Sequence, residues 1–291
     1  MPIRDPPNHT LSTPPADLTP DPPLASNAQA LAIQEAIAER LLAAPAEAPV
    51  GVVLLLEHEP VFTLGKRGRI ADVPGEGAAS GAGEADIAVH RSPRGGQATY
   101  HGPGQLVAYP IVNLRAARIG ARSYVESLER AIVRTCETFG VANAYPGSAA
   151  SDGATKTPGA LTGVWIPSDD PSAAPRKVAA VGVRISRGVA THGLALNVAN
   201  DLAPFERIVP CGLPGAQATS LAAEAARTAA GPTVAGVRGA LLSHLCDELG
   251  ATLVAEDAWG PAMGGLVGEA RRAGGAWAAF GADEEDDMAR L

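Results

Sequence analysis

The sequence lacks any run of about 18 uninterrupted apolar residues, the length that a membrane-spanning helix requires. Its first stretch, "MPIRDPPNHTLSTPPADLTPDPPL", also lacks the basic segment followed by an apolar segment that is typical of a secretory signal. These two absences predict a soluble protein that stays in the cytoplasm.

Cysteine is scarce: the chain has three, far apart and without any CxxC pair. Such a pattern argues against a disulfide framework and against a zinc site, so we expect reduced thiols and no metal. Cys136 and Cys246 fall on the apolar stripes of expected helices. Cys211 stands between Pro210 and Gly212 in the loop sequence "RIVPCGLPG", and it needs an explanation other than packing.

A basic surface and the common nucleotide motifs are missing as well. The formal net charge of -8 disfavours a nucleic-acid partner, although part of that charge lies in the "DEEDD" stretch at 283–287. Neither G-x-x-x-x-G-K-[ST] nor G-x-G-x-x-G after a strand occurs, so a phosphate cradle of either kind is not expected.

The composition predicts a globular domain between two biased ends. Of the 291 residues, 46% are hydrophobic and 19% are charged, which is enough to bury a sizeable core. Residues 1–25 contain eight prolines and are expected to be disordered. We expect the catalytic domain at 26–250 and a C-terminal extension with an acidic, disordered end at 251–291. Two Gly- and Ala-rich stretches, 72–86 and 147–160, are typical of surface insertions.

Hydrophobic periodicity predicts helices and strands that intermix without regular alternation. Helices are expected from a cap at Ser26 or Asn27, from a capping box at Ser123 and Glu126, and from 237 to a stop at Gly250. Strands are expected at 50–56 and in a hairpin that turns at Arg187 and Gly188. The stretch after Pro60 reads as a turn and a Gly-rich loop.

The stretch "RGGQATYHGPGQLVAYPI", 94–111, has the densest collection of polar side chains among glycines. Glycine lets backbone amides approach a ligand closely, whereas composition alone is equally compatible with an ordinary loop that leads into a strand. Four motifs in order, namely "LEHEPVFTLG", "RGGQATYHGPGQ", "RKVAAVGVRISRGVATHGLALNV" and "IVPCGL", resemble the LipB-type octanoyltransferases of protein lipoylation. The resemblance spans roughly Ala28–Gly250.

The resemblance implies an α/β (α+β) fold, a mixed β-sheet flanked by helices that is similar to the catalytic domain of biotin and lipoate protein ligases. It implies transfer of an octanoyl group from octanoyl-acyl carrier protein to a lysine of lipoyl domains. The implied acceptors are the lipoyl domains of 2-oxoacid dehydrogenase complexes and the glycine cleavage H protein. No cofactor, metal, nucleic acid or membrane is implied.

The same resemblance assigns roles to residues of this chain. Cys211 falls at the acylated cysteine, and Lys177 falls at the lysine that activates it. A nearby lysine favours the thiolate when cationic and accepts its proton when neutral. The segments that contact the acyl substrate correspond to Arg94, Gly95, Gly96, Gln97, Ala98, Thr99, Tyr100, His101, Ala180, Val181, Gly182, Gly193, Leu194 and Ala195.

Two histidines in these segments carry different expectations. On strand parity His192 shares a face with Leu194 and Leu196, so we interpret it as a core histidine with a satisfied ring. His101 is the better functional candidate, and we favour a positioning role because cysteine and lysine already account for activation.

Two alternatives stay open, and a third is weaker. An ATP-dependent biotin or lipoate ligase is suggested by the Arg- and Gly-rich sequence "LGKRGR" at 64–69, whose cations are also candidates for docking an acidic carrier protein. A noncatalytic interaction protein on the same fold would be expected to lose Cys211 or Lys177. A cysteine protease lacks support, because no protease signature surrounds Cys211.

Overall fold

The computed structural model describes residues 24–44, 49–73, 87–148, 161–168, 170, 173–208, 216–225, 231–254 and 276–282. The Pro-rich stretch 1–23, most of both expected insertions, the acidic end and Cys211 lie outside these residues. No helix in the described ranges is long and apolar enough to cross a membrane.

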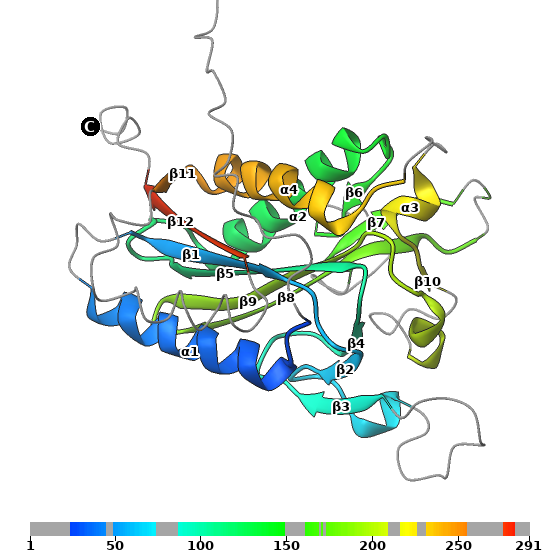
Figure 1. The fold of residues 1–291 in the computed structure, drawn as a ribbon, viewed down its shortest axis with the longest axis horizontal. Helices are drawn as coiled ribbons and strands as arrows, with labels where there is room; N and C mark the ends of the chain where they lie inside the picture. The colour runs from blue at the N-terminus through cyan, green and yellow to red at the C-terminus, as the bar shows by residue number, and fades with distance from the viewer. Residues whose placement is uncertain are drawn as a thin grey trace, which may run out of the picture.

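The described residues form a mixed sheet covered by helices on both faces, which confirms the predicted fold class (Figure 1). The sheet runs in the order β11 (Ala251–Val254), β12 (Ala276–Ala282), β1 (Gly51–Leu56), β5 (Gln105–Asn113), β9 (Val189–Asn197), β8 (Arg176–Ser186), β7 (Val164–Ile166) and β6 (Tyr145–Pro146). The short strand β10 (Gln217–Ala218) pairs in parallel with β8. A smaller sheet contains β3 (Ala88–Arg91), β2 (Val61–Leu64) and β4 (Ala98–His101).

The two faces of the main sheet explain why strand β1 reads as a continuous apolar run. Val52 and Leu54 pack with helix α1 (Asn27–Ala43), whereas Val53 and Leu55 pack with α2 (Ala121–Thr138) and α4 (Val234–Leu249). A strand that is buried on both faces needs apolar side chains at every position. Figure 1 shows α1 on one side of the sheet and α2 with α4 on the other.

The helix ends agree with the sequence in two places and differ in one. Ser26 caps α1, and Gly250 ends α4 in the left-handed conformation with φ 58°, as predicted. The capping box at Ser123 is wrong, because α2 begins at Ala121 after the N-cap Gly120. Glu126 instead forms a 2.8 Å ion pair with Arg122 one turn earlier.

The segment after Pro60 is a strand, which corrects the expected loop. Strand β2 pairs in parallel with β3 and antiparallel with β4, and all four of its residues are buried. Its sequence "VFTL" is short, so its pairing with partners far along the chain decides its conformation. This small sheet lies below one end of the main sheet in Figure 1.

The hairpin of β8 and β9 forms as predicted, with φ 54° at Arg187 and φ 92° at Gly188. The pairing of β5 with β9 is interrupted between Ala108↔Leu194 and Val112↔Ala190. Pro110 lies in the interruption, since proline has no N–H to donate to a neighbouring strand. At the edge of the sheet, β12 pairs antiparallel with β1 and β11, so the sheet continues past residue 250.

Candidate active site

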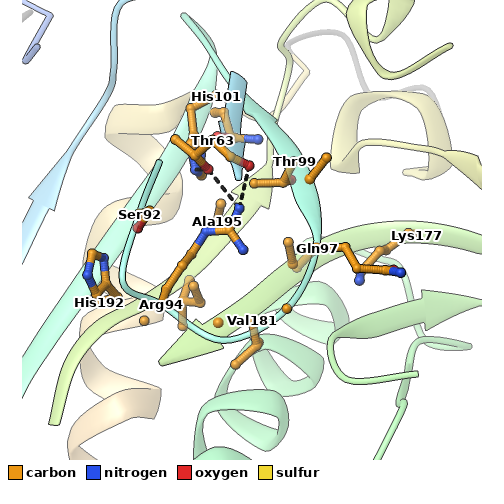
Figure 2. Close-up of a pocket in the computed structure, with 18 of the residues that line it drawn as sticks. Thr63, Ser92, Arg94, Gln97, Thr99, His101, Lys177, Val181, His192 and Ala195 are labelled. Carbon is orange, nitrogen blue, oxygen red and sulfur yellow. Dashed lines mark hydrogen bonds between the residues drawn. The ribbon is translucent and has the colours of Figure 1, made fainter. Parts of the chain in front are cut away.

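A pocket lies between the Gly-rich loop at 92–97, the start of β5, and strands β8 and β9. Figure 2 shows Arg94 near its centre, with Lys177 and His192 on opposite sides. The substrate segments implied by the sequence converge here: the pocket is lined by Arg94, Gly96, Gln97, Ala98, Thr99, His101, Ala180, Val181, Gly182, Gly193, Leu194 and Ala195. Gly95 and Tyr100 are not among its lining residues; the Tyr100 ring packs against Phe62 and Phe205 instead.

Backbone hydrogen bonds hold the Gly-rich loop in place. Lys66 N donates to Arg94 O at 2.9 Å, and Arg67 N donates to Gly96 O at 3.0 Å. On its other side Gly95 N donates to Val183 O at 2.9 Å. Gly96 has φ 86°, a conformation that an L side chain rarely adopts. The glycines therefore let the loop lie between two backbone segments.

Arg94 extends across the pocket and anchors its charge on β2. Its Nη2 donates to Thr63 O at 2.7 Å and to Thr63 Oγ1 at 2.8 Å, and these bonds are drawn in Figure 2. Its Cδ lies 3.2 Å from the point that a Cβ on Gly182 would occupy. The absence of a side chain at Gly182 thus leaves room for the Arg94 stem.

His101 is held as a neutral imidazole in one tautomer. Gln105 Nε2 donates to Tyr100 O and to Asn197 Oδ1, so its Oε1 faces His101 and accepts from Nδ1 at 2.8 Å. The other ring nitrogen is then an acceptor, 3.4 Å from the hydroxyl of Thr63. Burial, followed by the charges around it, holds the pKa of His101 well below its usual range. His101 therefore links β2 to β5, and its expected role in positioning a substrate stays a prediction.

Lys177 enters the pocket from β8. Its Nζ donates to Thr162 O at 3.0 Å and lies 4.9 Å from the centroid of the Trp165 ring. Ala218 of β10 pairs with Lys177. Ile208 and Ala218, which precede and follow Cys211 in the sequence, both line the same pocket.

His192 corrects the sequence interpretation. Its ring is buried, yet among the described residues its Nε2 has no hydrogen-bond partner. The strand-parity argument fails because His192 has φ 59°, beside the interruption caused by Pro110. Its ring contacts Tyr109, which packs on the α1 side, whereas Leu194 packs on the opposite side.

Several pocket residues escaped the sequence interpretation, notably Thr63, Asn197, Tyr109 and Ile208. The sequence predicts a loop at Thr63, and it indicates no partner for Asn197 at the end of the hairpin. The alternation of β-branched and aromatic residues in "VFTL" was the available signal for Thr63. No local signal joins Asn197 to Gln105, since they are 92 positions apart.

Residues 26–246 match the family model of the lipoyl protein ligase A/B catalytic domain. The chain belongs to this family. It is 45% identical over 196 residues to an octanoyltransferase of Acidothermus cellulolyticus, an alignment that covers 67% of this chain and 76% of the relative. It is 41% identical over 206 residues to an octanoyltransferase of Mycobacterium marinum, covering 70% and 78%.

The fold agrees with a solved lipoate protein ligase. The bipartite lipoate protein ligase of Thermoplasma acidophilum superposes with a TM-score of 0.51 at 17% identity, covering 78% of this chain and 82% of that protein. Within the lipoyl protein ligase family the pocket above is therefore built on a shared scaffold of sheet and flanking helices.

Acid is expected to destabilise this family member through its buried histidines. Burial lowers the pKa of His58 and of His192 to about 4, against 6.5 for an unperturbed imidazole. Between pH 6.5 and pH 4 these imidazoles are protonated in the unfolded chain but stay neutral in the folded one. The free energy of unfolding therefore falls as the pH drops over that range. Each imidazole contributes a loss of about 3 kcal/mol over that range.

Urea unfolding at a series of pH values measures this effect. His58→Gln is expected to flatten the dependence, whereas His90→Gln, on an exposed residue of β3, leaves it as in the parent. A free energy of unfolding that stays constant between pH 7 and pH 5 contradicts the prediction.

Proposed function

We propose that this chain transfers an octanoyl group from octanoyl-acyl carrier protein to a lysine of lipoyl domains, through an acyl thioester on Cys211. The observation that carries the proposal is the pocket, which Lys177 shares with the residues that flank the Cys211 loop on both sides. The octanoyltransferase relatives support the reaction type. The acceptors in this proposal are the lipoyl domains of 2-oxoacid dehydrogenase complexes and the glycine cleavage H protein.

The proposed chemistry balances without ATP. The Cys211 thiolate attacks the thioester carbonyl, the pantetheine thiolate leaves, and it takes up the proton that Cys211 had given to Lys177 or to solvent. The acceptor lysine amine then attacks the new thioester, its nitrogen gives up a proton to Lys177 or to solvent, and the amide forms as the Cys211 thiolate leaves. An amide is more stable than a thioester, so the second step runs downhill.

The small residues of β8 and β9 suit an unbranched acyl chain. Ala180, Gly182 and Ala195 line the pocket with few side-chain atoms, and a straight octanoyl chain needs a narrow apolar slot. Backbone N–H groups of the Gly-rich loop are the proposed donors to the thioester oxyanion.

An exposed basic cluster beside the Gly-rich loop supports an acidic carrier protein as donor. Lys66 and Arg67 are exposed, and their backbone amides bond directly to the Gly-rich loop. Arg69 is exposed as well, although its charge is shared with Asp72 at 3.4 Å. Exposed charges of this kind steer encounter more than they add affinity.

Intact-mass measurement of the full chain with octanoyl-acyl carrier protein, in the absence of ATP, tests the proposal. We expect the enzyme to gain the mass of one octanoyl group and to lose it when a lipoyl domain is added. An enzyme that stays unmodified without ATP, yet modifies the lipoyl domain when given free octanoate and ATP, would be a ligase.

Substitution by alanine is expected to have different effects at two glycines of the pocket. A Cβ on Gly182 would lie 3.1 Å from Gly95 O and 3.2 Å from Arg94 Cδ, so the Gly-rich loop and the Arg94 stem must move by a few tenths of an ångström and the pocket changes shape. We expect Gly182→Ala to lower kcat/KM for the octanoyl donor by about 10- to 200-fold. A Cβ on Gly193 would collide with the carbonyl oxygen of Ala108, so Gly193→Ala destabilises the fold by about 1–3 kcal/mol or more.

Thermal unfolding and steady-state kinetics on both variants separate these effects. The close approach of the Ala108 carbonyl requires glycine at position 193, in addition to any role that Gly193 has in lining the pocket. Unchanged kinetics for Gly182→Ala with octanoyl and longer donors would refute the slot.

A further inference from the structure

Glu129 is a fully buried carboxylate outside the proposed chemistry. It lies on α2, which packs against β7 and β8. Its Oε1 accepts from Gly163 N at 2.7 Å, and its Oε2 accepts from Ser148 N at 3.2 Å. A buried carboxylate is costly unless its oxygens are satisfied, so these two bonds specify where the chain segments at 148 and 163 lie.

The electrostatics of Glu129 involve Lys177. Burial raises the pKa of Glu129, while the hydrogen bonds from Gly163 and Ser148 and the positive charge of Lys177 lower it. The ammonium of Lys177 thus favours the ionised carboxylate. No hydrogen bond joins the two side chains in the described structure. Their hydrogen bonds instead meet on the backbone segment between them, because Glu129 accepts from Gly163 N and Lys177 donates to Thr162 O.

That backbone is the turn at 161–163, and each of its three residues is hydrogen-bonded to a different side chain. Leu161 O accepts from Trp165 Nε1 at 2.6 Å, Thr162 O accepts from Lys177 Nζ at 3.0 Å, and Gly163 N donates to Glu129. The carbonyl that receives the ammonium of Lys177 is therefore one residue from the amide that Glu129 holds.

Gly163 lets the side chain of Lys177 pack closely against the turn. It has φ 126°, and a Cβ there would lie 2.6 Å from Lys177 Cε and 2.6 Å from Ala179 O. The stem of Lys177 thus packs directly on the turn, as the missing side chain allows. A shift of the turn must shift the ammonium.

We propose that Glu129 is a positioning residue for Lys177, which it places by holding the turn at 161–163. This inference rests on the proposed role of Lys177. A displacement of about 1 Å at a reacting group can cost about 10²-fold in rate, so the carboxylate contributes to turnover without touching the substrate.

Glu129→Gln tests the inference with little change in volume. The glutamine oxygen can accept from one of the two backbone amides, while its NH₂ group faces the other donor. One of the two hydrogen bonds that fix the segments at 148 and 163 is therefore lost. We expect kcat to fall by about 10- to 100-fold with KM nearly unchanged. Glu137→Gln is the matched control, because it makes the same change at an exposed position of α2.

A double-mutant cycle separates positioning from general destabilisation. If Glu129 acts through Lys177, Glu129→Gln costs almost nothing in a Lys177→Ala background. The same fold-loss in both backgrounds would overturn the inference. If Lys177→Ala by itself keeps full activity, the proposed role of Lys177 fails. The spectroscopic test below then still shows whether Glu129 holds the turn.

The indole N–H of Trp165 provides that independent readout, since it donates to the same turn. In protein with ¹⁵N-labelled tryptophan, Glu129→Gln is expected to move the Trp165 indole peak, and Glu137→Gln is expected to leave it. An unmoved peak in folded Glu129→Gln refutes the inference. If Glu129→Gln fails to fold, Glu129→Asp is the second variant. It keeps the charge but its shorter side chain moves the carboxylate oxygens away from the turn, so it must shift the same peak.

Discussion

Cys211→Ala is expected to lose covalent octanoylation entirely, whereas Cys136→Ala and Cys246→Ala keep it. The acyl thioester needs a thiolate that substrate can reach. Cys136 is a core residue on the buried face of α2, and burial raises the pKa of its thiol to about 12. Cys246 is buried on α4. Neither side chain is therefore placed to accept an acyl group.

The measurement is intact mass after incubation with octanoyl-acyl carrier protein, followed by peptide mapping of the modified site. Cys136→Ala and Cys246→Ala serve as matched controls, because each makes the same chemical change in a different setting. An octanoyl group on the Cys211→Ala protein would show that another residue is the nucleophile and would overturn the mechanism.

Lys177→Ala is expected to slow acylation by about 10²- to 10⁴-fold, the range typical of a lost general acid or base. The ammonium contacts Thr162 O and the Trp165 ring in the pocket, so its removal takes a charge from the site while the strand pairing of β8 remains. Single-turnover acylation measures the rate, and alkylation of Cys211 as a function of pH measures its apparent pKa, which should rise.

Arg40→Ala, at an exposed position in the last turn of α1, is the control for a lost positive charge and should keep the chemical step. Lys177→Arg separates the two roles of the amine, because arginine keeps the charge but does not take up a proton at neutral pH. Full activity in Lys177→Arg indicates electrostatic activation. If Lys177→Ala leaves both the rate and the thiol titration unchanged, the assignment of Lys177 is wrong.

Much of the secondary structure follows from local chemistry. The cap at Ser26, the glycine stop at Gly250 and the turn at Arg187 and Gly188 depend on residues within a few positions of one another. The capping box at Ser123 shows the limit of this reasoning, since Glu126 pairs with Arg122 and the helix begins earlier. Local preference is overridden where a competing contact is available.

The family and its motifs are likewise properties of the sequence. The order of the four motifs led to the octanoyltransferase resemblance, and the match over 26–246 bears out the family. The same motifs named the segments that line the pocket. Glycine and alanine are informative there because a small residue indicates that another group packs close to the backbone. The sequence alone does not identify that group.

Only the tertiary structure decided which distant residues meet. Pro110 interrupts the pairing of β5 with β9, and His192 consequently leaves the alternation that strand parity assumes. Thr63 meets Arg94 and His101 because β2 pairs with β4. The physical reason is that hydrogen-bond partners and close packing depend on distances in space, which periodicity along one strand or helix does not encode.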